Sequence, residues 1–375
     1  MQQNAEKQLL VALSKFKLAR DWVAINGCIQ NIKEVCLNFR DEIYETPHTL
    51  LLSKTLSQCL SPSLPAGVQS SALDVYSLLF ETAGESRLLR DFYIWAPGIL
   101  QFFHSAGVSQ RVTTLKLFSD FFIPLIPSNH RLGPPIILPI LPGLTDDGTE
   151  VQSLDYQALD TIKRYLGSVQ FWRAMFRSAL THPNTRSAFL VFTNKSDPFS
   201  EFHDIHNNRA SGNDNDSNKN IDDLNDSRLI TSLFTVLFND SNVLIVRSAL
   251  ELFKASYSKL LSDGVKSDLS LKCFNLLSNE DKSIRRRVFQ WITENINSKI
   301  VHLAVSKAEP IAIKVALEKG DEIKKMVIEK CLTMILSRGS EFDISIFFNF
   351  PSFLVDLETV FKSVSSVVTL ENVQK

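Results

Sequence analysis

The chain has 375 residues, of which 44% are hydrophobic and 22% are charged, and 40 Lys+Arg against 41 Asp+Glu give a formal net charge of −1. This apolar content is sufficient for a large packed core and excludes a wholly disordered chain. The balanced charge argues against a dedicated nucleic-acid-binding protein, which normally carries a basic excess. The five cysteines form no C-x-x-C pair, so neither a disulfide framework nor a zinc cluster is predicted, and a reducing cytosolic setting is expected.

Apolar residues recur at helical spacing from the first half of the chain onward, whereas sustained alternation typical of strands is absent. One such stripe consists of Val68, Ala72, Leu73, Tyr76, Leu79 and Phe80. Prolines are expected to end helices and divide the chain into segments of helical length. They are Pro47, Pro62, Pro65, Pro97, Pro124, Pro127, Pro134, Pro135, Pro183 and Pro310. The pairs Thr149 with Gln152 and Ser278 with Asp281 resemble capping boxes that start two further helices.

The proline- and aromatic-rich region from Phe118 to Leu144 allows two interpretations. It is either a groove for extended peptides or, as the sequence favours, a set of corners between packed helices.

A polar segment divides the chain. Between residues 207 and 227, 12 of the 21 residues are Asn or Asp, and such a segment buries too little apolar surface to offset its ordering entropy. We therefore predict a first helical block over residues 1–206, a disordered loop or linker over 207–227, and a second helical block over 228–375.

The second block contains an internal repeat. An apolar-basic-x-x-apolar pattern begins at Val246, again at Ile284 and again at Ile323, at steps of 38 and 39 residues. Each copy follows an acidic residue, which is Asp240, Asp281 or Asp321. A period of about 40 residues is typical of HEAT and armadillo arrays, in which each helical pair buries its apolar face against its neighbours. The sequence thus predicts an all-α, helical-repeat (HEAT/armadillo-like) α-solenoid.

Several segments resemble the amino-terminal domain of the Dopey family. Residues 59–68 read C-L-S-P-S-L-P-A-G-V and match the family's C-L-x-P-S-L-P-x-G-V, which leads into a helix carrying A-L-x-V-Y, here residues 72–76. Residues 95–99 are similar to its S-P-G-L element, and residues 141–150 to its L-P-G-L-x-x-x-G-x-E. Later helices around 246–252 and 283–291 follow in the family's order. The polar segment at 207–227 departs from the family pattern.

The resemblance implies a non-enzymatic scaffold or adaptor in vesicle-mediated protein transport between endosomes and the Golgi. Members of this family act with a Mon2-like protein and a phospholipid flippase, and some animal members have been linked to kinesin light chains and to phosphatidylinositol 4-phosphate. The implied location is the cytosolic face of Golgi and endosomal membranes, with peripheral attachment. Family members are much longer than this chain, so functions of their remaining regions are not carried over.

A basic strip on the second block is the candidate binding site. Between Lys254 and Lys330 basic residues outnumber acidic ones by five. Lys282 and Arg286 are four residues apart and would share a helix face, which Lys324 and Lys325 would extend one repeat further along. Such a strip attracts anionic lipids, with about 1 kcal/mol per basic residue near the surface. The alternative is an ordinary solvated helix face with Arg285 bonding between repeats.

No signature of catalysis is present. The sequence contains no Walker loop, no G-x-G-x-x-G and no G-x-S-x-G, so we expect no enzyme, no cofactor and no metal. His203 and His206 form the one close histidine pair, and two solvated histidines explain them better than a zinc site, which needs three or four ligands. No apolar run reaches the roughly 18–20 residues of a membrane span; the nearest, residues 134–144, contains four prolines.

Overall fold

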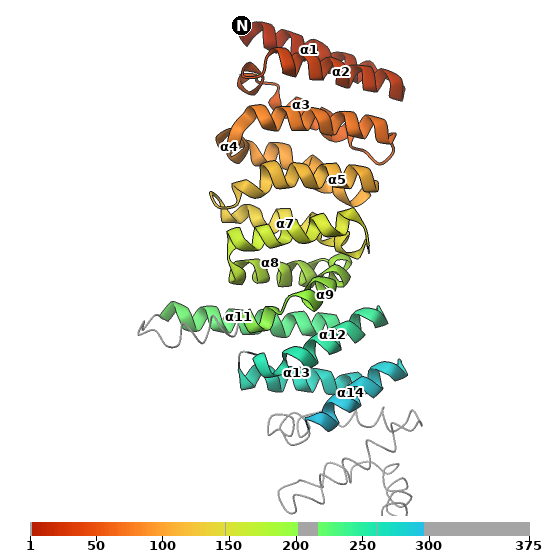
Figure 1. The fold of residues 1–375 in the computed structure, drawn as a ribbon, viewed down its shortest axis with the longest axis vertical. Coiled ribbons are helices and arrows are strands. Elements are labelled where there is room, and N and C mark those ends of the chain that lie inside the picture. Colours follow the sequence, from red (N-terminus) through yellow and green to blue (C-terminus); the bar gives the residue numbers. More distant parts are fainter. Residues whose placement is uncertain (1, 147, 202–216, 261, 296–375) are drawn as a thin grey trace, which may run out of the picture. The chain divides into compact units, whose positions relative to one another are not determined.

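The structure is a computed structural model, and it describes residues 2–146, 148–201, 217–260 and 262–295. Within these ranges every regular element is a helix, and no strand occurs (Figure 1). The predicted all-α helical-repeat class is therefore confirmed for the described part of the chain.

The chain divides into two compact units, Met1–Pro198 and Phe199–Lys375. The main helices of unit 1 are α1 (Gln2–Leu18), α2 (Trp22–Asn38), α3 (Thr49–Cys59), α4 (Ala66–Ser105), α5 (Val108–Leu117), α6 (Gly133–Ile140), α7 (Glu150–Leu166), α8 (Ser168–Thr181) and α9 (Arg186–Lys195). Short turns of helix join them: η1 (Glu42–Glu45), η2 (Phe118–Phe122, a π-helical turn), η3 (Ile123–Leu125), η4 (His130–Leu132), η5 (Leu141–Thr145) and η6 (Pro183–Thr185).

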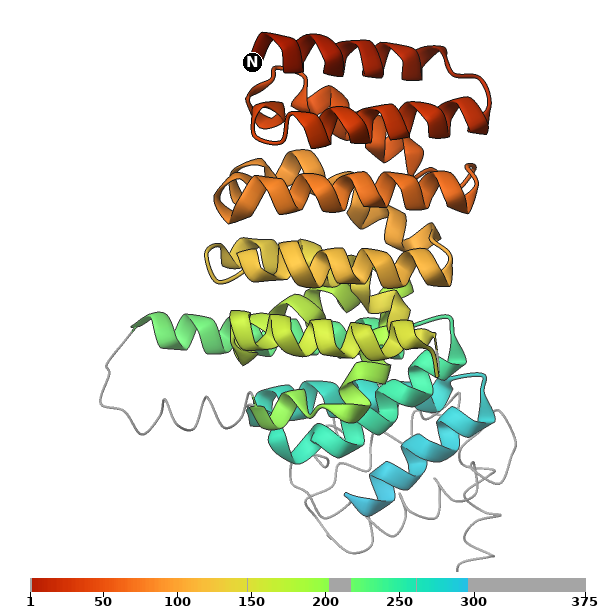
Figure 2. The same ribbon diagram turned by 45° about the horizontal axis from the view of Figure 1, so that its top comes forward.

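The helices of unit 1 stack in the manner of a solenoid (Figure 2). The main contacts join helices that are one or two positions apart along the chain: α1 contacts α2 and α3, and α4 contacts α2, α3, α5 and α6. Further on, α5 contacts α7, and α6 contacts both α7 and α8. Between these layers lies a core rich in aromatic rings, in which Trp95 meets Tyr76 and Phe80 edge-on. The predicted stripe from Val68 to Phe80 is buried at all six positions. Burial of each large apolar side chain contributes about 1.5–3 kcal/mol.

Helix α4 corrects one prediction about its boundaries. Pro97 was expected to end a helix, but it lies inside α4. The break occurs instead at Gly84, where φ is 67° and the backbone leaves the helical region. Glycine adopts this left-handed φ without the steric penalty of a side chain. Pro97 has no backbone N–H, so the hydrogen-bond ladder of α4 lacks one bond at this position.

The two predicted capping boxes have different outcomes. Thr149 caps α7, and its Oγ1 accepts a hydrogen bond from the Gln152 backbone N–H at 3.2 Å. The Gln152 side chain donates to the Leu144 carbonyl at 2.8 Å and accepts from the Gly148 N–H at 3.4 Å, so it reaches the backbone one residue before the cap. The second prediction is wrong, because Asp281 and not Ser278 caps the helix that follows. Asp281 directly precedes the first helical residue, so its carboxylate reaches the free N–H groups of the first turn, whereas the Ser278 hydroxyl lies three residues further back.

The described helices of unit 2 are α11 (Ser217–Phe238), α12 (Val243–Ser256), α13 (Asp263–Asn275) and α14 (Lys282–Glu294), joined by η7 (Tyr257–Lys259) and η8 (Leu276–Ser278). The helices of unit 2 also contact neighbours one or two positions along the chain: α11 contacts α12 and α13, and α12 contacts α14.

The polar segment is structured differently from the prediction over part of its length. Helix α11 begins at Ser217, so residues 217–227 lie in a helix rather than in a disordered linker. Leu233, Phe234 and Leu237 anchor the carboxyl-terminal half of α11 in the core. Once such a helix is nucleated, each added residue contributes one hydrogen bond, which extends it into polar sequence. Residues 202–216 lie outside the described residues.

Two copies of the predicted 38-residue pattern occupy equivalent helices. Val246 lies on α12 and Ile284 on α14, both are buried, and the two helices contact one another. The third copy, at Ile323, lies outside the described residues.

Candidate functional site

The predicted basic site starts on α14, whose first turn is fixed by Asp281. The Asp281 carboxylate accepts hydrogen bonds from the backbone N–H groups of Ser283 at 2.8 Å and Ile284 at 3.1 Å. The Ser283 hydroxyl also donates to it, and together with these bonds and the nearby Arg247 it lowers the pKa of Asp281 to about 2. The cap therefore stays ionised and holds the start of α14 in place.

Ion pairs join α14 to the equivalent helix of the preceding copy. The Arg247 guanidinium on α12 donates to Asp281 at 3.2 Å, and Arg287 on α14 pairs with Glu251 on α12. Buried Arg285 donates to the Asn279 and Glu280 carbonyls at 2.8 and 2.7 Å, within the loop before its own helix. The neighbouring arginines of this helix thus stabilise the repeat.

Lys282 and Arg286 differ from those neighbours because both side chains are exposed. They are one helical turn apart on α14, and neither forms an ion pair with any residue that the structure describes. Lys324 and Lys325 lie outside the described residues. The structure therefore brings together the first two members of the predicted site, while its extension stays a prediction.

Unit 1 contains an apolar groove between α4 and α6, with a volume of about 350 Å³. It is lined by Phe92, Tyr93, Ala96, Pro97, Leu100, Gln101 and His104 of α4 and by Pro135, Leu138 and Pro139 of α6. Burial, followed by the charge of Arg111, lowers the pKa of His104 at one end. Two prolines of the region 118–144, Pro135 and Pro139, line this groove, while Phe118 and Phe122 pack in the core. The interpretation as corners between packed helices fits these two rings, and binding of an extended peptide stays a prediction.

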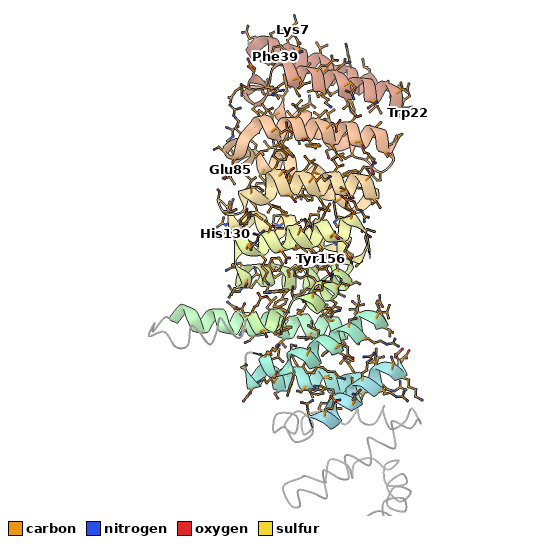
Figure 3. All side chains as sticks on the ribbon, in the orientation of Figure 1. Lys7, Trp22, Phe39, Glu85, His130 and Tyr156 are labelled. Atoms are coloured by element: carbon orange, nitrogen blue, oxygen red, sulfur yellow. The ribbon has the colours of Figure 1, made fainter. Side chains whose placement is uncertain are left out.

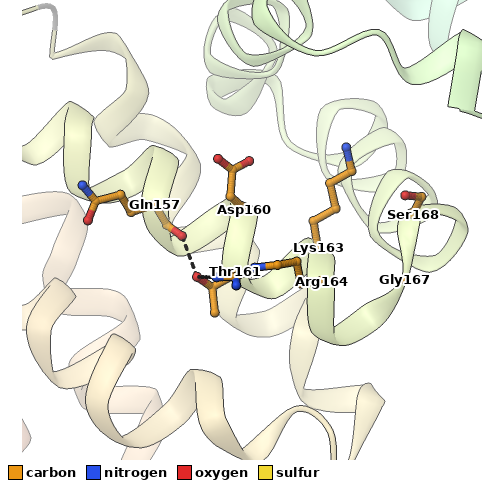
Figure 4. A pocket seen from close by; sticks show the side chains of 7 residues that line it. All are labelled: Gln157, Asp160, Thr161, Lys163, Arg164, Gly167 and Ser168. Atoms are coloured by element: carbon orange, nitrogen blue, oxygen red, sulfur yellow. Dashed lines mark hydrogen bonds between the residues drawn. The ribbon is translucent and has the colours of Figure 1, made fainter.

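A second depression in unit 1 is polar and open, and lies along the end of α7 (Figure 4). Its volume is about 880 Å³, and Gln157, Asp160, Thr161, Lys163, Arg164, Gly167 and Ser168 line it. Thr161 donates to the Gln157 carbonyl and accepts from Arg164, each at 2.9 Å. The Lys163 ammonium lies 5.3 Å from the centre of the Trp172 ring. The depression combines no nucleophile with a base, and its geometry is that of a solvated helix face.

One buried carboxyl was not singled out from the sequence. Asp155 on α7 is fully buried, and neither carboxylate oxygen has a hydrogen-bond partner among the described residues. Burial, assisted by the charge of Asp146 and opposed by Arg111, raises the pKa of Asp155 to about 8. A Cβ added at Gly143 would collide with this carboxyl, which explains why the L-P-G-L turn needs glycine there. The signal in the sequence was a carboxylate inside the apolar stripe of α7, beside Val151.

Neither a metal centre nor a membrane span occurs among the described residues. Among the described residues, no group of three or more His, Cys, Asp or Glu side chains is arranged to hold a metal ion. None of the described helices is long and apolar enough to cross a membrane. His203 and His206 lie outside the described residues.

Comparison with known proteins gives a consistent result. The family model described as "Dopey, N-terminal" matches residues 1–296. Protein DOP1 of Saccharomyces cerevisiae is 24% identical over 321 residues, covering 75% of this chain and 19% of the relative. Protein DOP1B of Mus musculus is 28% identical over 298 residues, covering 75% of this chain and 12% of the relative. Protein pad-1 of Caenorhabditis elegans is 23% identical over 290 residues, covering 75% of this chain and 11% of the relative.

The chain thus spans less than a fifth of the length of these curated relatives. No solved structure matches it significantly. The family match extends over both units and ends at residue 296, one residue beyond the last described position. On the strength of this match, the chain belongs to the Dopey family, whose amino-terminal domain it carries.

Proposed function

We propose that the chain is the amino-terminal part of a non-enzymatic scaffold in vesicle-mediated transport between endosomes and the Golgi, attached peripherally to membranes. The observation that supports this most strongly is the family match over residues 1–296, since the resemblance implies such a role. The stacked helices are compatible with it, because solenoids present extended surfaces that bind partners without chemistry.

The proposed partners are a Mon2-like protein, a phospholipid flippase and a kinesin light chain. The test is a pull-down from cell lysate with the tagged chain, after circular dichroism has shown that it is folded. Recovery of a Mon2-like protein or a flippase supports the scaffold. Recovery of neither by the folded chain, in a lysate where a full-length relative recovers them, would contradict it.

A second candidate function is direct binding of a phosphoinositide, or of a kinesin adaptor, by the basic strip. The observation in its favour is the exposure of Lys282 and Arg286 on one face of α14, next to arginines that are occupied in the repeat. A headgroup with several phosphate charges gains from such paired cations, because each contributes about 1 kcal/mol near a membrane surface.

Flotation with vesicles containing phosphatidylinositol 4-phosphate tests this candidate. The variant reverses four charges, Lys282→Glu, Arg286→Glu, Lys324→Glu and Lys325→Glu, and its flotation should be weaker than that of the wild type. A matched control reverses Lys116, Arg131, Arg177 and Lys54, four exposed basic residues of unit 1. Equal flotation of wild type and strip variant removes the strip from consideration. Once circular dichroism has shown that the strip variant is folded, its pull-down result reports on the scaffold separately.

A further inference from the structure

An exposed surface of mixed apolar and basic character lies where α1 turns into α2. We call it the hairpin face. It consists of Lys15, Lys17, Leu18, Arg20, Trp22 and Val23. Leu18 is 74% exposed, Trp22 58% and Val23 59%. Figure 3 shows Trp22 at the outer end of this helical hairpin. Three large apolar side chains within six residues are mostly exposed to water here, and such a cluster of exposed apolar surface is unusual in a folded protein.

The exposed apolar side chains are not the side of α1 that packs against the rest of unit 1. Helix α1 already packs against α2 and α3, and its residues Leu9, Ala12 and Leu13 are all buried. Leu10 and Val11 continue the exposed side at 43% and 49%. The first helix is therefore apolar on both faces, and the outer one is unpartnered in the described structure.

The charge of the hairpin face is positive throughout. Lys15, Lys17 and Arg20 are exposed, and none forms an ion pair with a described residue. From residue 7 to residue 33 the sequence has a single acidic side chain, Asp21. That carboxylate accepts a hydrogen bond from the Ala24 N–H at 2.8 Å and caps α2, where the helix N-terminus offsets its charge. The three cations are thus available to an external anion.

We propose that the hairpin face docks on a lipid bilayer with anionic headgroups and inserts its apolar side chains into the interface. The inference rests on the peripheral membrane attachment proposed above, and it names the part of the chain that makes contact. Tryptophan favours the headgroup level, leucine and valine the acyl boundary, and flanking lysine and arginine the anionic surface. A turn with outward-pointing side chains fits a planar, deformable surface, whereas a protein helix would need a groove.

Vesicle flotation of the full chain tests the electrostatic half. The vesicles contain phosphatidylcholine alone or phosphatidylcholine with phosphatidylserine. We expect flotation with the anionic vesicles only. Because each basic residue changes partitioning about fivefold, Lys15→Gln/Lys17→Gln/Arg20→Gln lowers it about a hundredfold. A control with the same charge loss, Lys116→Gln/Arg131→Gln/Arg177→Gln, alters exposed residues elsewhere in unit 1 and should partition like the wild type.

Tryptophan fluorescence tests the insertion half. The chain has four tryptophans, and Trp95, Trp172 and Trp291 are buried, so Trp22 is the one that water and lipid reach. Anionic vesicles should shift its emission to the blue, and brominated acyl chains should quench it. In Trp22→Phe, which keeps an aromatic ring, the spectral response should vanish while flotation persists. In Leu18→Ser/Trp22→Ser, flotation should fall at least tenfold, since about 1.4 kcal/mol of apolar transfer corresponds to that factor.

The proposal is overturned if the neutralised hairpin variant floats like the wild type, if the wild type does not float on anionic vesicles, or if it floats without quenching of Trp22. A hairpin-dependent capture of a protein in place of vesicle binding also overturns it. Circular dichroism on each variant excludes loss of fold as the cause. If the pull-down described above succeeds while flotation fails, the hairpin face is wrong and the scaffold stands. If flotation succeeds and the pull-down fails, the hairpin face stands and the scaffold with these partners is wrong.

Discussion

The buried carboxyl of Asp155 makes the stability of unit 1 depend on pH in an unusual direction. Its pKa is about 8 in the folded chain, against an ordinary value of 3.8. Between these values the unfolded chain releases the proton and the folded chain retains it. Folding therefore takes up a proton, and stability falls as pH rises. The substitution Asp155→Asn replaces the carboxyl with a neutral amide of the same shape and removes this dependence.

The size of the effect follows from the shift. Each pKa unit corresponds to about 1.4 kcal/mol. From pH 5 to pH 8, most of the range between the two pKa values is crossed, so the wild type should lose about 4 kcal/mol at this position. The Asn variant should lose none there. Since a domain of this kind is stable by only about 5–15 kcal/mol, such a loss is readily measured.

Urea unfolding at pH 5, 6, 7 and 8, followed by circular dichroism, gives the comparison. Other groups that titrate in this range are common to wild type and variant and cancel in the difference. Asp160→Asn is the matched control, because Asp160 is on the same helix and exposed. Its unfolding curves should follow those of the wild type at every pH.

The reasoning is refuted if wild type and Asp155→Asn keep a constant difference in unfolding free energy from pH 5 to pH 8. A difference of the opposite sign, with the wild type gaining on the variant as pH rises, would show that the carboxylate is ionised and partnered in the fold.

Three other predictions concern single contacts. Gly143→Ala should destabilise unit 1 by about 1–3 kcal/mol, because the added methyl group collides with the Asp155 carboxyl. In a double-mutant cycle, the same substitution should cost less when Asp155 is already alanine, whereas equal costs would place the strain elsewhere. Asp281→Ala should lower the free energy of unfolding in urea by about 1 kcal/mol, because it removes the cap of α14. Asp281→Asn should retain most of that stability, since an amide oxygen can still cap the helix, whereas a purely ionic role would give equal losses for both variants. Cys36 and Cys59 are buried with pKa values raised to about 12 by burial, so both should resist iodoacetamide at pH 8 until urea is added; rapid labelling of the native chain would contradict their placement.

The helical class was predictable because periodicity is a local property. The stripe ending at Phe80 and the paired positions Val246 and Ile284 follow the 3.6-residue period and the repeat length, and all are buried as expected. The break in α4 was not predictable from proline, since Gly84 provides it while Pro97 remains within the helix. Which residue breaks a helix depends on the packing around it, and packing is not local.

The candidate sites show the same division. The four-residue spacing of Lys282 and Arg286 indicated a common helix face, and both side chains are exposed on α14. The hairpin face could not be found in this way. Residues 9–13 are apolar without interruption, so their pattern does not distinguish the side that packs from the side that meets water. That distinction required the positions of α2 and α3.

The contacts of unit 1 also determine how it would respond to a mechanical load. Its principal contacts join helices one or two steps apart along the chain, so a force between its first and last helices passes through every interface in series. The load is then distributed over many interfaces, and the unit can lengthen by small displacements at several of them before any part of the core unfolds. A solenoid held at its two ends would in this way absorb tension while its helices remain folded.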